Sequence, residues 1–249
     1  MVRLQRCPAW FHARYKWLFI ASAALTIGAH AADAQLEEPV VTESTSPIVG
    51  VRTHWEVRLM EPEWKLGTPQ FIAVITPDGS LNNDFAILEL NHSTIPEATA
   101  GGIQFQVWHG DLPVKWYSPG SNIACQYAGE TIRFTMEMKL EKADSGGQQI
   151  VFSVINLASS TWGKIGTVAT FTRPTQLTSL NGFTPHSSVK ESGVSVGGNR
   201  VEYMKIDSID YLAADGTRTS NSTDHLVHSA KQLVETQLDA ATIDKVLAY

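Results

Sequence analysis

Apolar and polar residues alternate with a period of two along much of the chain, a pattern typical of β-strands that bury one face. Residues 51–59 and 132–141 show it most clearly. Their apolar-face positions are Val51, Thr53, Trp55, Val57, Leu59, Ile132, Phe134, Met136, Met138 and Leu140. Charged and polar residues such as Arg52 and Glu137 fill the positions between them. Both segments are therefore predicted to be half-buried strands, with Trp55 in the core.

Further strand-like runs are separated by turn residues rather than by helical segments. They cover residues 70–76, 84–91, 103–109, 149–157, 165–172 and 200–212. About eight strands without intervening helices predict an all-β fold, an antiparallel β-sandwich or jelly roll over residues 49–215.

The end of the chain has a different pattern. Ser222, Thr223 and Asp224 are candidate caps, and apolar residues such as Leu226 and Leu233 then recur at helical spacing. We therefore predict a helical tail over residues 216–249.

The first residues have the composition of a secretory signal peptide. Four basic residues and no acid precede a short apolar run, and the small-x-small sites ending at Ala31 and Ala34 follow. We expect cleavage after Ala34, with Ala31 as the alternative, because the apolar run is shorter than a membrane-spanning helix needs. Residues 1–34 are thus a signal peptide, residues 35–48 a flexible acidic leader, and the mature chain, with no membrane span, is secreted or periplasmic.

Charge and cysteine content narrow the classes of partner. The whole chain has a net charge of −6, and removing residues 1–34 takes away four of its 19 basic and one of its 25 acidic residues, which leaves −9. An acidic chain without a basic cluster argues against nucleic acid or anionic lipid as partner. Cys7 leaves with the signal, so Cys125 stands alone and no intramolecular disulfide forms.

An aromatic and polar cluster is the strongest candidate site. Alternation sends Ile103, Phe105 and Val107 to the core and Gln104 and Gln106 to the opposite face. The candidate ligand-binding residues are Trp108, His109, Asp111, Trp116 and Tyr117. Flat aromatic rings beside amide and acid side chains suit sugars, which stack on aromatics and hydrogen-bond through hydroxyls. Burial of both tryptophans in the fold is the alternative.

No pattern assigns a catalytic residue. Gly193 to Gly197 fit G-x-S-x-G around Ser195, but the strand-to-helix context of a nucleophile elbow is missing. The histidines show neither H-E-x-x-H nor zinc-finger spacing, so we predict no metal and no cofactor. Calcium is the one open alternative, because Asp78, Asn82, Asn83 and Asp84 crowd one turn, although an Asx-rich turn is favoured.

Short motifs between residues 127 and 183 resemble a family of secreted bacterial β-sandwich proteins of unknown function. The motifs are Tyr127 to Thr131, Trp162 to Ile165, Phe171 to Pro174 and Asn181 to Phe183. Members of that family are similar to lectin-like jelly rolls and often accompany carbohydrate-active modules. The resemblance implies a fold and offers no catalytic residue to carry over.

Three functions fit these observations. The leading hypothesis is an exported, lectin-like carbohydrate-binding module with a glycan or polysaccharide as partner. A glycoside hydrolase or polysaccharide lyase on the same scaffold is the second, and a structural or adhesive envelope protein is the third. Fold alone does not choose among them.

Overall fold

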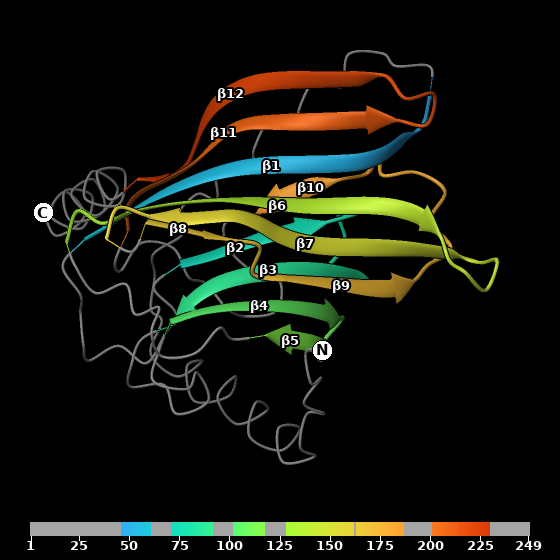
Figure 1. Ribbon diagram of the computed structural model, residues 1–249, viewed down its shortest axis with the longest axis horizontal. Helices are drawn as coiled ribbons and strands as arrows, with labels where there is room; N and C mark the ends of the chain where they lie inside the picture. Colours follow the sequence, from blue (N-terminus) through green and yellow to red (C-terminus); the bar gives the residue numbers. More distant parts are fainter. Residues whose placement is uncertain are drawn as a thin grey trace, which may run out of the picture. The chain divides into compact units, whose positions relative to one another are not determined.

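The computed structural model describes residues 46–60, 71–91, 102–117, 128–161, 163–186 and 201–229. Within these ranges the chain forms twelve strands and no helix (Figure 1). The strands are β1 (Ile48–Leu59), β2 (Phe71–Thr76), β3 (Asp84–Asn91), β4 (Gly102–His109), β5 (Leu112–Tyr117), β6 (Thr131–Lys142), β7 (Gln148–Ser159), β8 (Gly163–Gly166), β9 (Ala169–Pro174), β10 (Thr184–His186), β11 (Val201–Ala213) and β12 (Arg218–Ser229). The predicted all-β class is confirmed for the part of the chain that is described.

The strands form two antiparallel sheets. The larger has the order β12-β11-β1-β6-β7-β8, and β9 also pairs with β7. The smaller has the order β10-β2-β3-β4-β5. Figure 1 shows β1 inside the larger sheet, between β11 and β6. The first strand of the described chain is therefore flanked by strands from its middle and its end.

One hydrophobic core joins the two sheets. Phe134 of β6 stacks on Trp55 of β1 and on Phe71 of β2, with 6.0 Å between ring centroids in each pair. Phe105 of β4 stacks on Phe171 of β9 at 5.4 Å. We call the face of each sheet that carries these rings its inner face and the opposite face its outer face. Aromatic rings from both sheets in contact are what a β-sandwich buries between its layers.

Alternation predicted the inner face of the long strands correctly. All five apolar-face residues of residues 51–59 and all five of residues 132–141 are at most 6% exposed. Trp55 is 1% exposed, and its Nε1 donates to Thr53 Oγ1 at 2.8 Å, so the one polar atom of the indole keeps a partner in the core. The predicted strand over residues 165–172 is instead divided into β8 and β9 at Gly166, whose φ is 91°.

The prediction of a helix from residue 216 onward is wrong over residues 218–229, which form strand β12. Asp215 and Gly216 form a tight turn, in which Gly216 has a φ of 89° and Ala213 N donates to Thr217 O at 2.9 Å. An Asp-Gly pair favours a β-hairpin, and the Thr and Ser residues that follow are poor helix formers. The chain therefore returns along β11. The remainder of the predicted tail, residues 230–249, lies outside the described residues, as do the predicted signal peptide and most of the predicted leader.

A β-bulge in β7 offers a test of backbone strain. Asn156 has a φ of 56°, the only positive value at a non-glycine position among the described residues, and it lies where the pairing with β6 shifts register. We expect Asn156→Ala to lower the free energy of unfolding by about 1 kcal/mol, because alanine tolerates the left-handed region less well than asparagine. Urea titration measures this, and Asn156→Gly is the control that should lose no stability.

Among the described residues, none belongs to a helix long and apolar enough to cross a bilayer.

Candidate functional site

The outer face of the larger sheet carries the polar positions that alternate with the core. Register places Arg52 of β1 directly opposite Asp210 of β11 on one side and Glu137 of β6 on the other. On the same face, His54 lies opposite Ser208 and Thr135. Charged and hydroxyl side chains from three strands are thus arranged in rows across the sheet.

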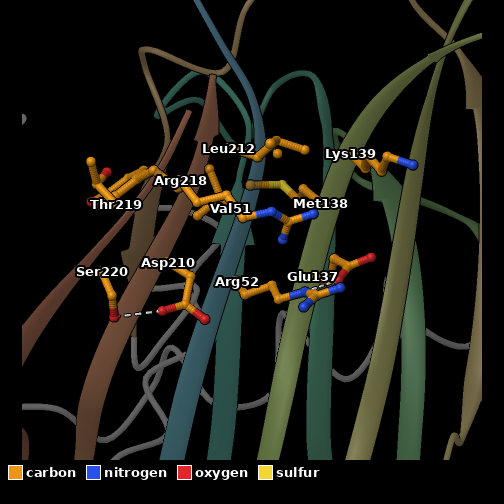
Figure 2. Close-up of a pocket in the computed structure, with 12 residues that line it drawn as sticks. Val51, Arg52, Glu137, Met138, Lys139, Asp210, Leu212, Arg218, Thr219 and Ser220 are labelled. Carbon is orange, nitrogen blue, oxygen red and sulfur yellow. Dashed lines mark hydrogen bonds and ion pairs between the residues drawn. The ribbon is translucent and has the colours of Figure 1, made fainter. Parts of the chain in front are cut away.

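A groove of about 370 Å³ opens in this face around Gly50 (Figure 2). Gly50 of β1 has no side chain to fill the row between Leu212 and Lys139, its partners on the neighbouring strands. A Cβ added there would lie 3.2 Å from Leu212 Cβ, so the hollow depends on glycine. The charged and hydroxyl side chains along the groove include Arg52, Glu137, Lys139, Asp210, Arg218 and Ser220.

Both carboxylates of the groove have partners. Arg52 Nε forms an ion pair with Glu137 Oε2. Asp210 accepts a hydrogen bond from Ser220 Oγ at 2.6 Å, and its other oxygen lies 2.8 Å from His54 Nε2. Burial raises the pKa of Asp210, but the bonds from Ser220 and His54 outweigh it, and the pKa lies below its usual range. Asp210 is therefore an anion and an acceptor at neutral pH.

His54 links Asp210 to Thr135 in a hydroxyl–imidazole–carboxylate chain. Its Nδ1 lies 3.2 Å from Thr135 Oγ1, and its Nε2 faces Asp210. The order of groups is that of a nucleophile, a base and an orienting acid. Thr135, however, is only 2% exposed, so a substrate carbonyl cannot reach its hydroxyl. These hydrogen bonds fix the orientation of the imidazole ring and link the three strands β1, β6 and β11.

Further along the same face, Glu56 collects three partners. Its carboxylate accepts from Tyr203 Oη at 2.7 Å, pairs with Arg133, and lies 3.7 Å from Lys205 Nζ. Burial raises the pKa of Glu56, but the Tyr203 hydrogen bond and the Arg133 ion pair together lower it by more. The resulting pKa is below the usual glutamate value. The Glu56 bond also raises the pKa of Tyr203. This cluster joins β1, β6 and β11 further along β1 than the groove residues.

The sequence-predicted cluster is divided between two faces of the smaller sheet. Trp108 lies on the outer face, where it packs on Phe85 with 6.5 Å between ring centroids and is 9% exposed. Trp116 is partly buried on the neighbouring strand, paired in register with Gln106. The side chains of His109 and Tyr117 lie on the inner face of the sheet. His109 Nδ1 lies 2.7 Å from Asp84 Oδ1, and Tyr117 packs against the core.

Asp111 is exposed in the turn between β4 and β5. The structure therefore brings Trp108 and Trp116 to adjacent strands, but it does not gather all five residues on one surface. The alternation of a strand forces this separation, because consecutive residues point to opposite faces.

The outer face of the smaller sheet is polar and buried at the same time. Trp108 Nε1 donates to Gln106 Oε1 at 2.6 Å, and Gln106 Nε2 donates to Glu89 Oε1 at 2.6 Å and to Gln104 Oε1 at 3.1 Å. These four side chains are each at most 9% exposed. The indole, the amides and the Glu89 carboxylate thus hydrogen-bond to one another, as buried polar groups must.

His109 takes part in a contact between the sheets. Asp84 of β3, its partner, also binds Arg173 of β9, with 3.2 Å between Arg173 Nε and Asp84 Oδ2. The pair joins the smaller sheet to the larger one at the end of β4. His109 is therefore accounted for by a structural role.

The Asp78 turn has internal partners. Asp78 accepts from Ser80 N at 3.0 Å and from Asn83 Nδ2 at 2.6 Å, which is the Asx-turn geometry favoured from sequence. Among the described residues, no group of three His, Cys, Asp or Glu side chains is placed to hold a metal ion. Ser195 and Cys125 lie outside the described ranges.

The groove residues were not recognised as a site from sequence. Alternation already placed Arg52 and His54 opposite the core, but it gave no partner for β1. Two local signals were available. Gly50 is a position without a side chain on a strand face where the neighbouring positions have large ones. The Asp215-Gly216 pair predicts the hairpin that brings Arg218 beside β11.

No protein-family model and no curated protein matches the chain. Among solved structures it is similar to the alginate lyase Aly36B, with a TM-score of 0.28 and 13% identity over 51% of this chain, and it spans about half (52%) of that structure. Two variants of that enzyme, bound to alginate trisaccharide and tetrasaccharide, give TM-scores of 0.31 and 0.32 at 12% identity, each covering 72% of both chains. Scores of this size establish neither a shared fold nor a shared activity, so function is inferred from the groove itself.

Proposed function

We propose that this chain is an exported, non-catalytic carbohydrate-binding β-sandwich protein, of the lectin-like or jelly-roll kind, that binds a glycan along the outer face of its larger sheet. The observation that carries the proposal is the groove around Gly50. Export to the periplasm or the cell exterior is part of the proposal and follows from the basic, apolar and small-residue order of residues 1–34.

The chemistry of the groove matches what sugars offer. A sugar ring presents hydroxyls that both donate and accept, and the groove supplies guanidinium and ammonium donors, carboxylate acceptors and hydroxyls. Arg52 and Glu137 hold each other in place, and His54 and Ser220 hold Asp210. Side chains fixed before binding lose less conformational entropy when the ligand arrives.

Binding is favoured over hydrolysis by the charge state of the carboxylates. A glycoside hydrolase needs one protonated carboxyl as general acid, with its pKa raised toward neutrality. Asp210 in the groove, and Glu56 outside it on the same face, have pKa values below the usual range and stay charged. Asp210 is therefore suited to accept hydrogen bonds from a ligand and Glu56 to hold the strands together, and neither is suited to donate a proton.

Filling the groove is the direct test. We expect Gly50→Val to weaken glycan binding about tenfold, because its side chain occupies the hollow and displaces sugar contacts equivalent to a few hydrogen bonds. Residues 35–249 are tested by pull-down on a polysaccharide panel, with tryptophan fluorescence and released sugar followed together. Gly50→Ala, the smaller change, covers the outcome in which the valine variant unfolds.

Two control variants show whether the glycan binds at the groove or on the smaller sheet. Leu112→Ala removes a 55% exposed side chain from β5 and should change neither binding nor melting. Trp116→Ala tests the aromatic site predicted from sequence. Loss of binding in that variant alone would move the site to the smaller sheet, release of sugar would replace the binding function by an enzymatic one, and no binding across the panel would reject the proposal.

A further inference from the structure

Resting on the proposed function, the geometry points to an acidic sugar as the ligand, and we propose that Arg218 binds its carboxylate. Arg218 begins β12 and lies opposite Leu212, beside the hollow at Gly50. In Figure 2 its side chain points from β12 toward β1, along the groove rather than away from it.

The distribution of ion pairs separates Arg218 from the other cations. Arg52 is neutralised by Glu137, and Lys139 Nζ lies 2.7 Å from Glu141 Oε1. Arg218 is exposed and has no acidic partner among the residues that the structure describes. Its guanidinium keeps five N–H donors in a planar fork, the geometry that matches a carboxylate with two parallel hydrogen bonds.

The acids of the groove do not compete for Arg218. Glu137 is engaged by Arg52, and the two oxygens of Asp210 are engaged by Ser220 and His54. Among the described residues, Arg218 is therefore the one cation of the groove without an ion-pair partner, in a chain whose net charge is −6. A chain with a net negative charge repels polyanions, so an unpaired guanidinium selects where an acidic polysaccharide can bind.

A sugar that carries both a carboxylate and hydroxyls fits this arrangement. Arg218 takes the carboxylate, and Ser220, two residues further along β12 and on the same face, has its hydroxyl beside it. Uronic acids are a class of sugar that has both groups on one ring. The polymer is therefore inferred to be a uronate-containing polysaccharide rather than a neutral glucan.

Paired polymers test the inference. Polygalacturonate, alginate and hyaluronate are each compared with their carboxyl-reduced forms, which keep the hydroxyls and lose the charge. For at least one pair we expect the acidic form to bind about tenfold tighter in 50 mM salt, and we expect this preference to shrink in 500 mM salt. Arg218→Gln should lower binding of the acidic form to the level of the reduced form, so that the preference disappears.

The control variant is Lys164→Gln, which makes the same charge change on β8, at the other end of the strand order from β12. It should keep the preference for the acidic polymer, whereas an equal loss in both variants would mean that net charge alone is responsible and would overturn the assignment to Arg218. Equal binding of acidic and reduced forms would overturn the acidic ligand and leave the glycan-binding function standing. Binding of neither form, together with a negative neutral panel, would reject both.

Discussion

Phe134→Ala is expected to lower the free energy of unfolding by about 3–5 kcal/mol, the range for truncating a buried phenylalanine. Phe134 is 2% exposed and stacks on Trp55 of its own sheet and on Phe71 of the other. Alanine leaves a cavity bordered by both rings, and close packing allows only partial collapse around it. Guanidinium titration followed by tryptophan fluorescence measures the loss, and Trp55 reports directly on the affected site.

Two comparisons make this result specific to the stack. Leu112→Ala, on an exposed side chain, should stay within about 0.5 kcal/mol of the parent. Phe134→Leu should recover most of the loss, because it refills much of the cavity. A loss below about 1 kcal/mol for Phe134→Ala would mean that this stack does not join the sheets.

Glu56→Gln is expected to cost about 2 kcal/mol at pH 7, since it weakens charge-assisted hydrogen bonds at a site that is 7% exposed. Arg133 is mostly exposed, which keeps the loss below that of a fully buried ion pair. The pKa of Glu56 is lower in the folded chain than its ordinary value of 4.5. The folded state therefore gains stability from the ionised carboxylate above about pH 4.5, and this gain is lost as the pH falls through the folded pKa.

The stability that Glu56 contributes can be tested by measuring unfolding as a function of pH. The difference between parent and Glu56→Gln should be constant from pH 6 to pH 8 and should shrink at acid pH, where both chains carry a neutral side chain. Glu202→Gln is the matched control, because Glu202 pairs with Arg58 where both side chains are exposed, and it should cost less than about 1 kcal/mol. A difference that grows at low pH would contradict the ionised state of Glu56.

Properties that depend on one strand alone were predictable. The period of two placed the inner faces of β1 and β6, and the predicted strand over residues 84–91 has the bounds of β3. Properties that depend on a partner strand were not. Leu226 begins a run of apolar residues with helical spacing. Residues 218–229 nevertheless pair with the backbone of β11 and form a strand.

The candidate site shows the same limit. Trp108 and His109 are neighbours in sequence and were grouped for that reason, although alternation places them on opposite faces of the sheet. Gly50 and Arg218 are far apart in sequence and meet only because β1, β11 and β12 are adjacent. A groove built across strands needs their order, and composition and periodicity do not contain that order.

The central position of β1 has a consequence for the time course of folding. Its contacts span long stretches of chain: Arg52 meets Glu137 85 residues later, and His54 meets Asp210 156 residues later. The hairpins of β2 to β5 close over short loops and can form as soon as they are synthesised, whereas β1 stays without either neighbour until β6 and then β11 have left the ribosome. Chains dominated by such distant pairings fold on the millisecond-to-second scale, and the backbone amides that pair β1 with β6 and β11 should be the last to gain protection in pulsed hydrogen exchange.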